Sequence, residues 1–172
     1  MMSGMTDRDI STEPQANILC KDCGLCCTGH LFIWTKLRSI ELDSIEALGV
    51  NVVRSIPIQR GFNQPCPLWK GQCTIYETRH YPRFCHTYKC ALLRQLLEES
   101  TSLPQAQSVI EQAKKLIREV EALLPPSSNQ NFRERLAAHL EDPKATDMEL
   151  QQKAEELLSM YEQIFGVKDV IE

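Results

Sequence analysis

The stretch CKDCGLCC, residues 20–27, holds four of the eight cysteines in this chain of 172 residues. Two residues separate Cys20 from Cys23, and two separate Cys23 from Cys26. Two sulfurs at this spacing can reach one metal ion from a tight turn, and Gly24 suits the positive φ that such a turn often needs. Zinc knuckles share this spacing, and a triple cysteine run also begins cubane iron–sulfur sites. The stretch therefore predicts a site for Zn²⁺ or for an iron–sulfur cluster.

The last cysteine of the stretch does not fit the same site as easily. Cys27 directly follows Cys26, and neighbouring residues seldom point at one ion, so Cys27 indicates a second site or a redox role. The fourth ligand of the triple run has to come from elsewhere, and Cys66, followed by Pro67, is a candidate. The eight sulfurs divide into two four-cysteine sites, or into one such cluster and a looser set. The candidate metal ligands are Cys20, Cys23, Cys26, Cys27, Cys66, Cys73, Cys85 and Cys90.

Four histidines are further candidates, with weaker claims than the thiols. His80 and His86 lie close enough in sequence to the cysteines to supply nitrogen ligands. A surface or structural imidazole is nevertheless the more frequent role for such residues. His30 has less support, and His139 falls in a predicted helix far from the cysteines. The aromatic residues near the motifs are expected to enclose the metal site rather than to stack on nucleic acid, namely Trp34, Trp69, Tyr76 and Phe84.

The redox compartment decides between metal ligands and disulfides. Residues 1–10 are polar and carry acidic side chains, unlike the basic and apolar parts of a signal peptide. No apolar run reaches the roughly 18 to 20 residues that span a bilayer. The protein is therefore expected to be cytoplasmic, with no membrane association. In a reducing cytoplasm, eight clustered cysteines indicate metal binding rather than a disulfide framework.

Charge is distributed unevenly along the chain. Residues 20–94 contain ten Lys and Arg against five Asp and Glu, whereas the whole chain has a net charge of −4. Four thiolates around one divalent ion carry a charge of about −2. Two such sites would offset most of the local basic excess. Local charge balance is therefore favoured over a nucleic-acid patch.

The chain divides into three predicted segments. Residues 1–16 are expected to be a flexible tail, residues 17–92 a cysteine-cluster metal-binding module, and residues 93–172 a helical segment that packs on this module. The fold class is mainly α: an irregular, metal-stapled, cysteine-rich module with one short helix, followed by a C-terminal half of three to four helices. The short helix is expected at 37–48 with Gly49 as its stop, and β-prone stretches at 50–53 and 56–58.

Capping signals predict the helices of the C-terminal half. One helix covers 91–97, and a second begins after Ser102 and runs to residue 124, with an apolar stripe from Val109 to Leu123. A third covers 131–140. The fourth is expected to open with a capping box, Thr146 to Glu149, and to end near Phe165. The stripe is expected to pack on the fourth helix and on the cysteine module.

The cysteine motifs resemble those of the YkgJ-type cysteine-cluster family, whose pattern is CxxCxxCC and whose relatives include flagellin lysine N-methylase. The resemblance covers about residues 18–92 and rests on the 20–27 stretch, on Cys66-Pro-Leu68, on residues 71–79 and on Cys85-x-x-Tyr88-x-Cys90. It implies zinc or iron chelation by these cysteines. Two departures concern arginine: two residues separate Arg79 from Pro82, and His86 stands where the family has Arg.

Three functions remain open from the sequence. The first is a metal-binding protein that holds an iron–sulfur cluster or zinc, with iron slightly favoured because of the triple cysteine run. The second is a cluster-dependent enzyme, either protein lysine N-methylase-like or an oxidoreductase, although no glycine-rich strand-to-helix loop for an adenosyl cofactor is found. The third is an interaction module with a structural zinc site, whose acidic helical half binds a protein partner not identified by the sequence.

Overall fold

The fold is mainly helical, as the sequence predicted. The computed structural model describes residues 14–55 and 58–168. In chain order the elements are α1 (Gln15–Cys23), β1 (Trp34–Lys36), η1 (Ser39–Glu41), α2 (Leu42–Glu46), β2 (Gly61–Asn63), α3 (Arg83–Thr87), α4 (Ala91–Leu97), α5 (Leu103–Leu123), α6 (Phe132–Glu141) and α7 (Met148–Gln163). A cysteine-rich N-terminal region is thus followed by helices.

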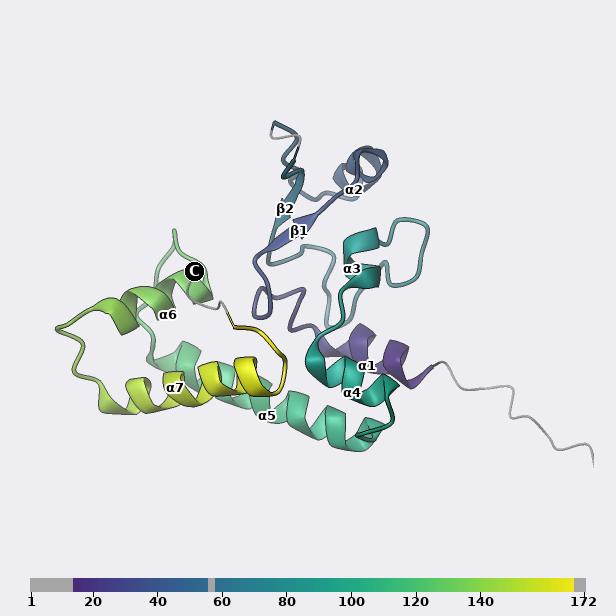
Figure 1. The fold of residues 1–172 in the computed structure, drawn as a ribbon. Coiled ribbons are helices and arrows are strands. Elements are labelled where there is room, and N and C mark those ends of the chain that lie inside the picture. The colour runs from purple at the N-terminus through teal and green to yellow at the C-terminus, as the bar shows by residue number, and fades with distance from the viewer. Residues whose placement is uncertain (1–13, 56–57, 169–172) are drawn as a thin grey trace, which may run out of the picture.

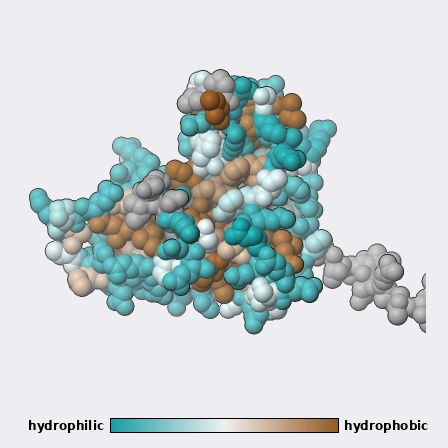
Figure 2. Space-filling model, viewed as in Figure 1, coloured by the Kyte–Doolittle hydropathy of each residue, from teal (hydrophilic) through white to brown (hydrophobic). Residues whose placement is uncertain are grey.

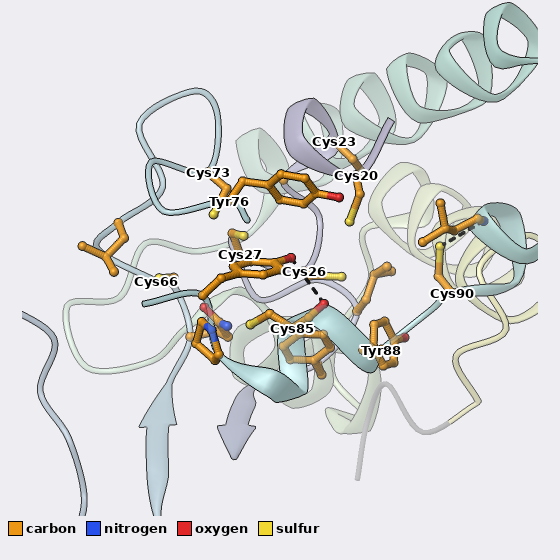
Figure 3. Close-up of a pocket in the computed structure, with 18 of the residues that line it drawn as sticks. Cys20, Cys23, Cys26, Cys27, Cys66, Cys73, Tyr76, Cys85, Tyr88 and Cys90 are labelled. Atoms are coloured by element: carbon orange, nitrogen blue, oxygen red, sulfur yellow. Dashed lines mark hydrogen bonds between the residues drawn. The ribbon is translucent and has the colours of Figure 1, made fainter. Parts of the chain in front are cut away.

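Helix α5 is the base on which the other long helices pack. It contacts α7, α1 and α4, and α1 also contacts α4. The small sheet and α2 rise from this helical layer as an upper lobe, with α3 between the two (Figure 1). The sheet is a single antiparallel pair in which Thr35 faces Phe62. The cysteine-bearing segments lie where the lobe meets the helices (Figures 1 and 3).

Two separate hydrophobic cores follow from this arrangement. The larger core joins α1, α4, α5 and α7, and its most buried large side chains include Tyr161, Phe165 and Leu157. The smaller core lies in the upper lobe and consists of Leu37, Leu42, Ile45, Val50, Val52 and Phe62. On the face shown in Figure 2, apolar side chains gather between the upper lobe and the helices, and hydrophilic residues surround them. An apolar surface thus lies at the junction of the upper lobe and the helices.

Local capping signals predicted the C-terminal helices well. Helix α4 covers the expected residues, and Ser102 caps α5 by accepting a hydrogen bond from the Gln105 N–H. The predicted start of α7 was one residue early. Its N-cap is Asp147, whose carboxylate accepts the Leu150 N–H at 3.0 Å, so the Thr146 capping box is not formed. A carboxylate one residue later competes successfully with the threonine hydroxyl for the free N–H groups.

Two other predictions were wrong. The tight turn predicted at the first cysteines is instead a helix, since α1 begins at Gln15 and continues through Cys23. The predicted tail lies mostly in residues 1–13, which are outside the described residues. The β-prone stretches do not form the sheet: Val53 makes only an isolated bridge to Gly61, and residues 56–57 lie outside the described residues. The actual strands are three residues each. These strands form because segments far apart in sequence pair with each other, so local β propensity could not predict their positions.

The stripe on α5 faces the larger core, as expected. Ala113, Leu116 and Val120 are buried, and Ile110 and Ile117 extend the same face. The opposite face of α5 carries charged residues. Within the described ranges, no helix combines the length and the apolar character needed to cross a bilayer.

One buried polar pair lies inside the larger core. His30 Nδ1 and the Tyr161 hydroxyl share a hydrogen bond of 2.8 Å, and the ring of Phe132 packs edge-on against the imidazole at 4.8 Å. Burial, and less strongly the nearby Arg133 charge, lower the pKa of His30 to about 4. The imidazole is therefore neutral in the folded protein at neutral pH.

This pair predicts an acid-dependent loss of stability. The ordinary histidine pKa is about 6.5, so between that value and 4 the unfolded chain binds a proton that the folded chain does not. Stability then falls as the pH falls, by about 2 kcal/mol between pH 7 and pH 5 from this residue. Urea unfolding at both pH values measures it. A His30→Asn variant should lose this part of the pH dependence, whereas equal losses in both proteins would contradict the assignment.

Candidate metal centre

The N-terminal cysteines lie at the end of α1 and in the turn after it. Cys20 and Cys23 are three residues apart and therefore share one face of the last helical turn. The helix stops at Gly24, which has the predicted positive φ, +73°. Lys114 of α5 fixes this end by donating from Nζ to the Asp22 carbonyl at 3.3 Å. The sequence predicted a tight turn here, and the structure replaces it with a helix end that faces α4 and α5.

The other four cysteines are brought to the same place by backbone contacts and short helices. The Cys66 N–H donates to the Cys27 carbonyl at 2.7 Å, and the Cys73 N–H donates to the Lys21 carbonyl at 3.2 Å. Cys85 lies on α3, and Cys90 is the N-cap of α4. Its Sγ accepts the Leu93 N–H at 3.5 Å. These hydrogen bonds connect the loop between β2 and α3 to the 20–27 stretch without the help of a metal.

All eight cysteines line one cavity of about 70 Å³ (Figure 3). Each is a free thiol and is partly buried. The rest of the lining is apolar or weakly polar, and includes Tyr76, Tyr81, Tyr88, Phe32 and Gln64. One water needs roughly 10–15 Å³, so the cavity has room for small ions. The structure therefore gathers every cysteine that the sequence singled out.

Burial keeps most of these thiols protonated in the absence of a metal. Burial, and less strongly the neighbouring cysteines, raise the pKa of Cys20 to about 11 and the pKa of Cys23 and Cys85 to about 12. Cys73 is the exception. A hydrogen bond from the Cys27 thiol lowers the pKa of Cys73 to about 7 and raises that of Cys27. Cys73 thus has thiolate character near neutral pH.

The donor set fits a soft metal, but the sulfurs are not yet in a ligand arrangement. Within residues 14–55 and 58–168, no three Cys, His, Asp or Glu side chains form a group that could hold an ion as they stand. Gln64, which also lines the cavity, is a second group whose contacts are incomplete. Its Nε2 donates to Thr35 Oγ1 at 2.7 Å, while its buried Oε1 has no partner in the described part of the chain. Binding through these residues requires the sulfurs to move closer together.

The histidines lie outside this arrangement. His86 is exposed on α3, and His80 accepts a hydrogen bond from Arg79 Nε at 3.0 Å. Neither lines the cavity, and His30 belongs to the larger core. His139 lies on α6, as predicted.

The aromatic enclosure was predicted only in part. Tyr76 lines the cavity, whereas Trp34, Trp69 and Phe84 do not. Phe84 packs against Phe32, which does, at a ring distance of 5.1 Å. The sequence did not predict that Tyr81 and Tyr88 also line the cavity. Their positions in the sequence next to the cysteine motifs could have indicated this role. The Tyr81 hydroxyl donates a hydrogen bond to the Cys85 carbonyl at 3.3 Å, which holds the ring at the cavity.

Comparison with known proteins gives one match. The model of a family described as a "putative zinc- or iron-chelating domain" matches residues 19–116, which is more than half of the chain. The match includes all eight cysteines and extends through α4 into α5. No curated protein and no solved structure matches.

Proposed function

This chain belongs to the CxxCxxCC family, as its cysteine motifs predicted, and from that premise we propose that it binds iron or zinc through the eight cysteines of its cavity. The observation that carries the proposal is the convergence of eight free thiols on one largely apolar space. Thiolates select zinc and iron–sulfur clusters over the hard ions that prefer oxygen. A reducing compartment such as the cytoplasm keeps the thiols free for this role.

Backbone N–H groups around the sulfurs support the same function. Cys66 accepts from Leu68 and Trp69, and Cys73 accepts from Ile75 and Tyr76. Cys23 and Cys90 also accept backbone N–H groups. Such bonds stabilise the thiolate form that metals require, and they contribute to the reduction potential of iron–sulfur clusters.

An iron–sulfur cluster is the first choice of metal group, because the run of Cys20, Cys23 and Cys26 has the spacing with which cubane sites begin. A bound cluster would supply one-electron chemistry, whereas zinc would supply structural crosslinks. In either case the chain itself contributes thiolates, N–H donors and an apolar wall of aliphatic and tyrosine side chains.

Anaerobic purification followed by metal, sulfide and absorbance analysis tests the proposal. The expected result is iron together with sulfide and visible absorption. A colourless protein that contains stoichiometric zinc would support metal binding and identify the metal as zinc. A His86→Ala variant is the matched control, because this imidazole is exposed and lies outside the cavity. It should retain the full metal content. A folded, colourless wild-type protein that takes up neither metal would overturn the proposal.

A further inference from the structure

Five of the eight cysteines pack against one of the two hydrophobic cores, and the core separates them into two groups. Cys20, Cys23, Cys26 and Cys90 all pack against the larger helical core. Cys66 packs instead against the core of the upper lobe. In Figure 3, Cys20, Cys26 and Cys90 lie toward the helices, and Cys27, Cys66 and Cys73 lie on the other side.

Every pair within the first group is close enough for one thiol charge to act on the other. Cys26 interacts with Cys23, Cys90 and Cys20. Cys23 interacts with Cys90 and Cys20. For Cys20, the strongest interaction with another thiol is that with Cys90. This closeness follows from the packing of α1 on α4, because α1 carries two of these cysteines and Cys90 caps the other helix.

In the second group, five of the six pairs interact in the same manner. The Cys27 thiol makes a side-chain hydrogen bond with Cys73, and it also interacts with Cys26, its neighbour in the chain, and with Cys66. Cys66 interacts with Cys73. For Cys85, the two strongest charge interactions are with Cys66 and Cys73. These four residues come from the end of the 20–27 stretch, from the loop after β2 and from α3.

A pair of tyrosines lies between the groups. The rings of Tyr76 and Tyr81 are 5.0 Å apart. Tyr81 interacts with Cys20 of the first group and with Cys85 and Cys73 of the second. Figure 3 shows Tyr76 between Cys73 and Cys20. Interactions between the groups remain, such as Cys20 with Cys73 and Cys26 with Cys85. For Cys20 the interaction with Cys90 is stronger, and for Cys26 those with all three other members of the first group are stronger.

We propose that the chain holds two separate four-cysteine metal sites, one formed by Cys20, Cys23, Cys26 and Cys90 and the other by Cys27, Cys66, Cys73 and Cys85. The adjacent Cys26 and Cys27 serve different sites, which removes the difficulty of two neighbouring residues pointing at one ion. Two sites with four thiolates around a divalent ion also offset most of the basic excess of residues 20–94. This inference rests on the proposed function.

Zinc titration of the reduced, metal-free protein tests it, with zinc counted by native mass spectrometry and folding followed by circular dichroism. The wild type is expected to bind two zinc ions. Cys90→Ser and Cys27→Ser should each lose one. The double variant Cys90→Ser/Cys23→Ser should still bind one ion, because both residues belong to one site, whereas Cys90→Ser/Cys27→Ser should bind none.

The outcomes separate the two proposals. A wild type that binds a single ion, or a single variant that loses all the zinc while remaining folded, would overturn the two-site division and leave metal binding intact. A folded wild type that takes up neither zinc nor iron would overturn metal binding itself. If a variant does not fold, the wild-type count still decides between one site and two.

Discussion

Removing the bound metal from the wild-type protein is expected to lower its midpoint of thermal unfolding by roughly 8 to 16 °C. A ligand that binds only the folded state stabilises it by about 4 kcal/mol when its free concentration is a thousand times the Kd. For a chain of this size, each kcal/mol shifts the midpoint by about 2 to 4 °C. Calorimetry of metal-loaded and chelator-treated protein, kept reduced, measures the shift.

The loss of stability on metal removal should be largest between β2 and α4. Residues 64–82 contain no helix or strand in the described structure, and contacts such as Cys66 N–H to the Cys27 carbonyl hold them. Metal removal should therefore speed hydrogen exchange there more than in α5 and α7, whose buried side chains form the larger core. His86→Ala is again the control and should show the same shift as the wild type. Identical midpoints with and without metal would mean that the metal contributes nothing to stability.

The sequence predicted the C-terminal helices because their signals are local. Ser102 and Asn131 each begin a helix by accepting an N–H three residues later, so the caps could be recognised from a few neighbouring residues. Helix α1 was missed because only Leu19 of its nine residues is buried, which leaves no apolar periodicity to detect. The sheet was missed because its partners, β1 and β2, are far apart in sequence.

The candidate site was predictable in its members but not in its geometry. Cysteine spacing was enough to select all eight thiols that line the cavity. The sequence favoured Cys66 as the fourth partner of Cys20, Cys23 and Cys26, whereas the structure places Cys90 among them. That neighbour depends on the packing of α1 against α4, and no spacing between residues 20 and 90 encodes it. Gln64 was missed for a similar reason, since only the tertiary fold buries its amide beside the thiols.

Gly24→Ala is expected to destabilise the protein by about 2 to 5 kcal/mol and to weaken metal binding. Gly24 has φ +73°, a conformation that costs an alanine about 1 to 2 kcal/mol. A Cβ there would also overlap the indole ring of Trp69. Relieving such overpacking costs a further 1 to 3 kcal/mol or so. Urea unfolding and zinc competition with a chelator measure the two effects.

The chain offers a matched control for each cause. Gly71 has φ +80° in the same loop as Trp69, and a Cβ there meets nothing within 4 Å, so Gly71→Ala tests the backbone cost without the clash. It should destabilise the protein clearly less than Gly24→Ala.

Adding Trp69→Leu to Gly24→Ala should recover part of the lost stability, because the shorter side chain leaves room for the methyl group. Metal affinity should follow the same order. The backbone N–H of Trp69 donates to the Cys66 sulfur, and the Trp69 backbone pairs with Cys73 in an isolated bridge, so a shift of Trp69 should displace both ligands. Equal losses in Gly24→Ala and Gly71→Ala would show that the indole contact does not position the loop.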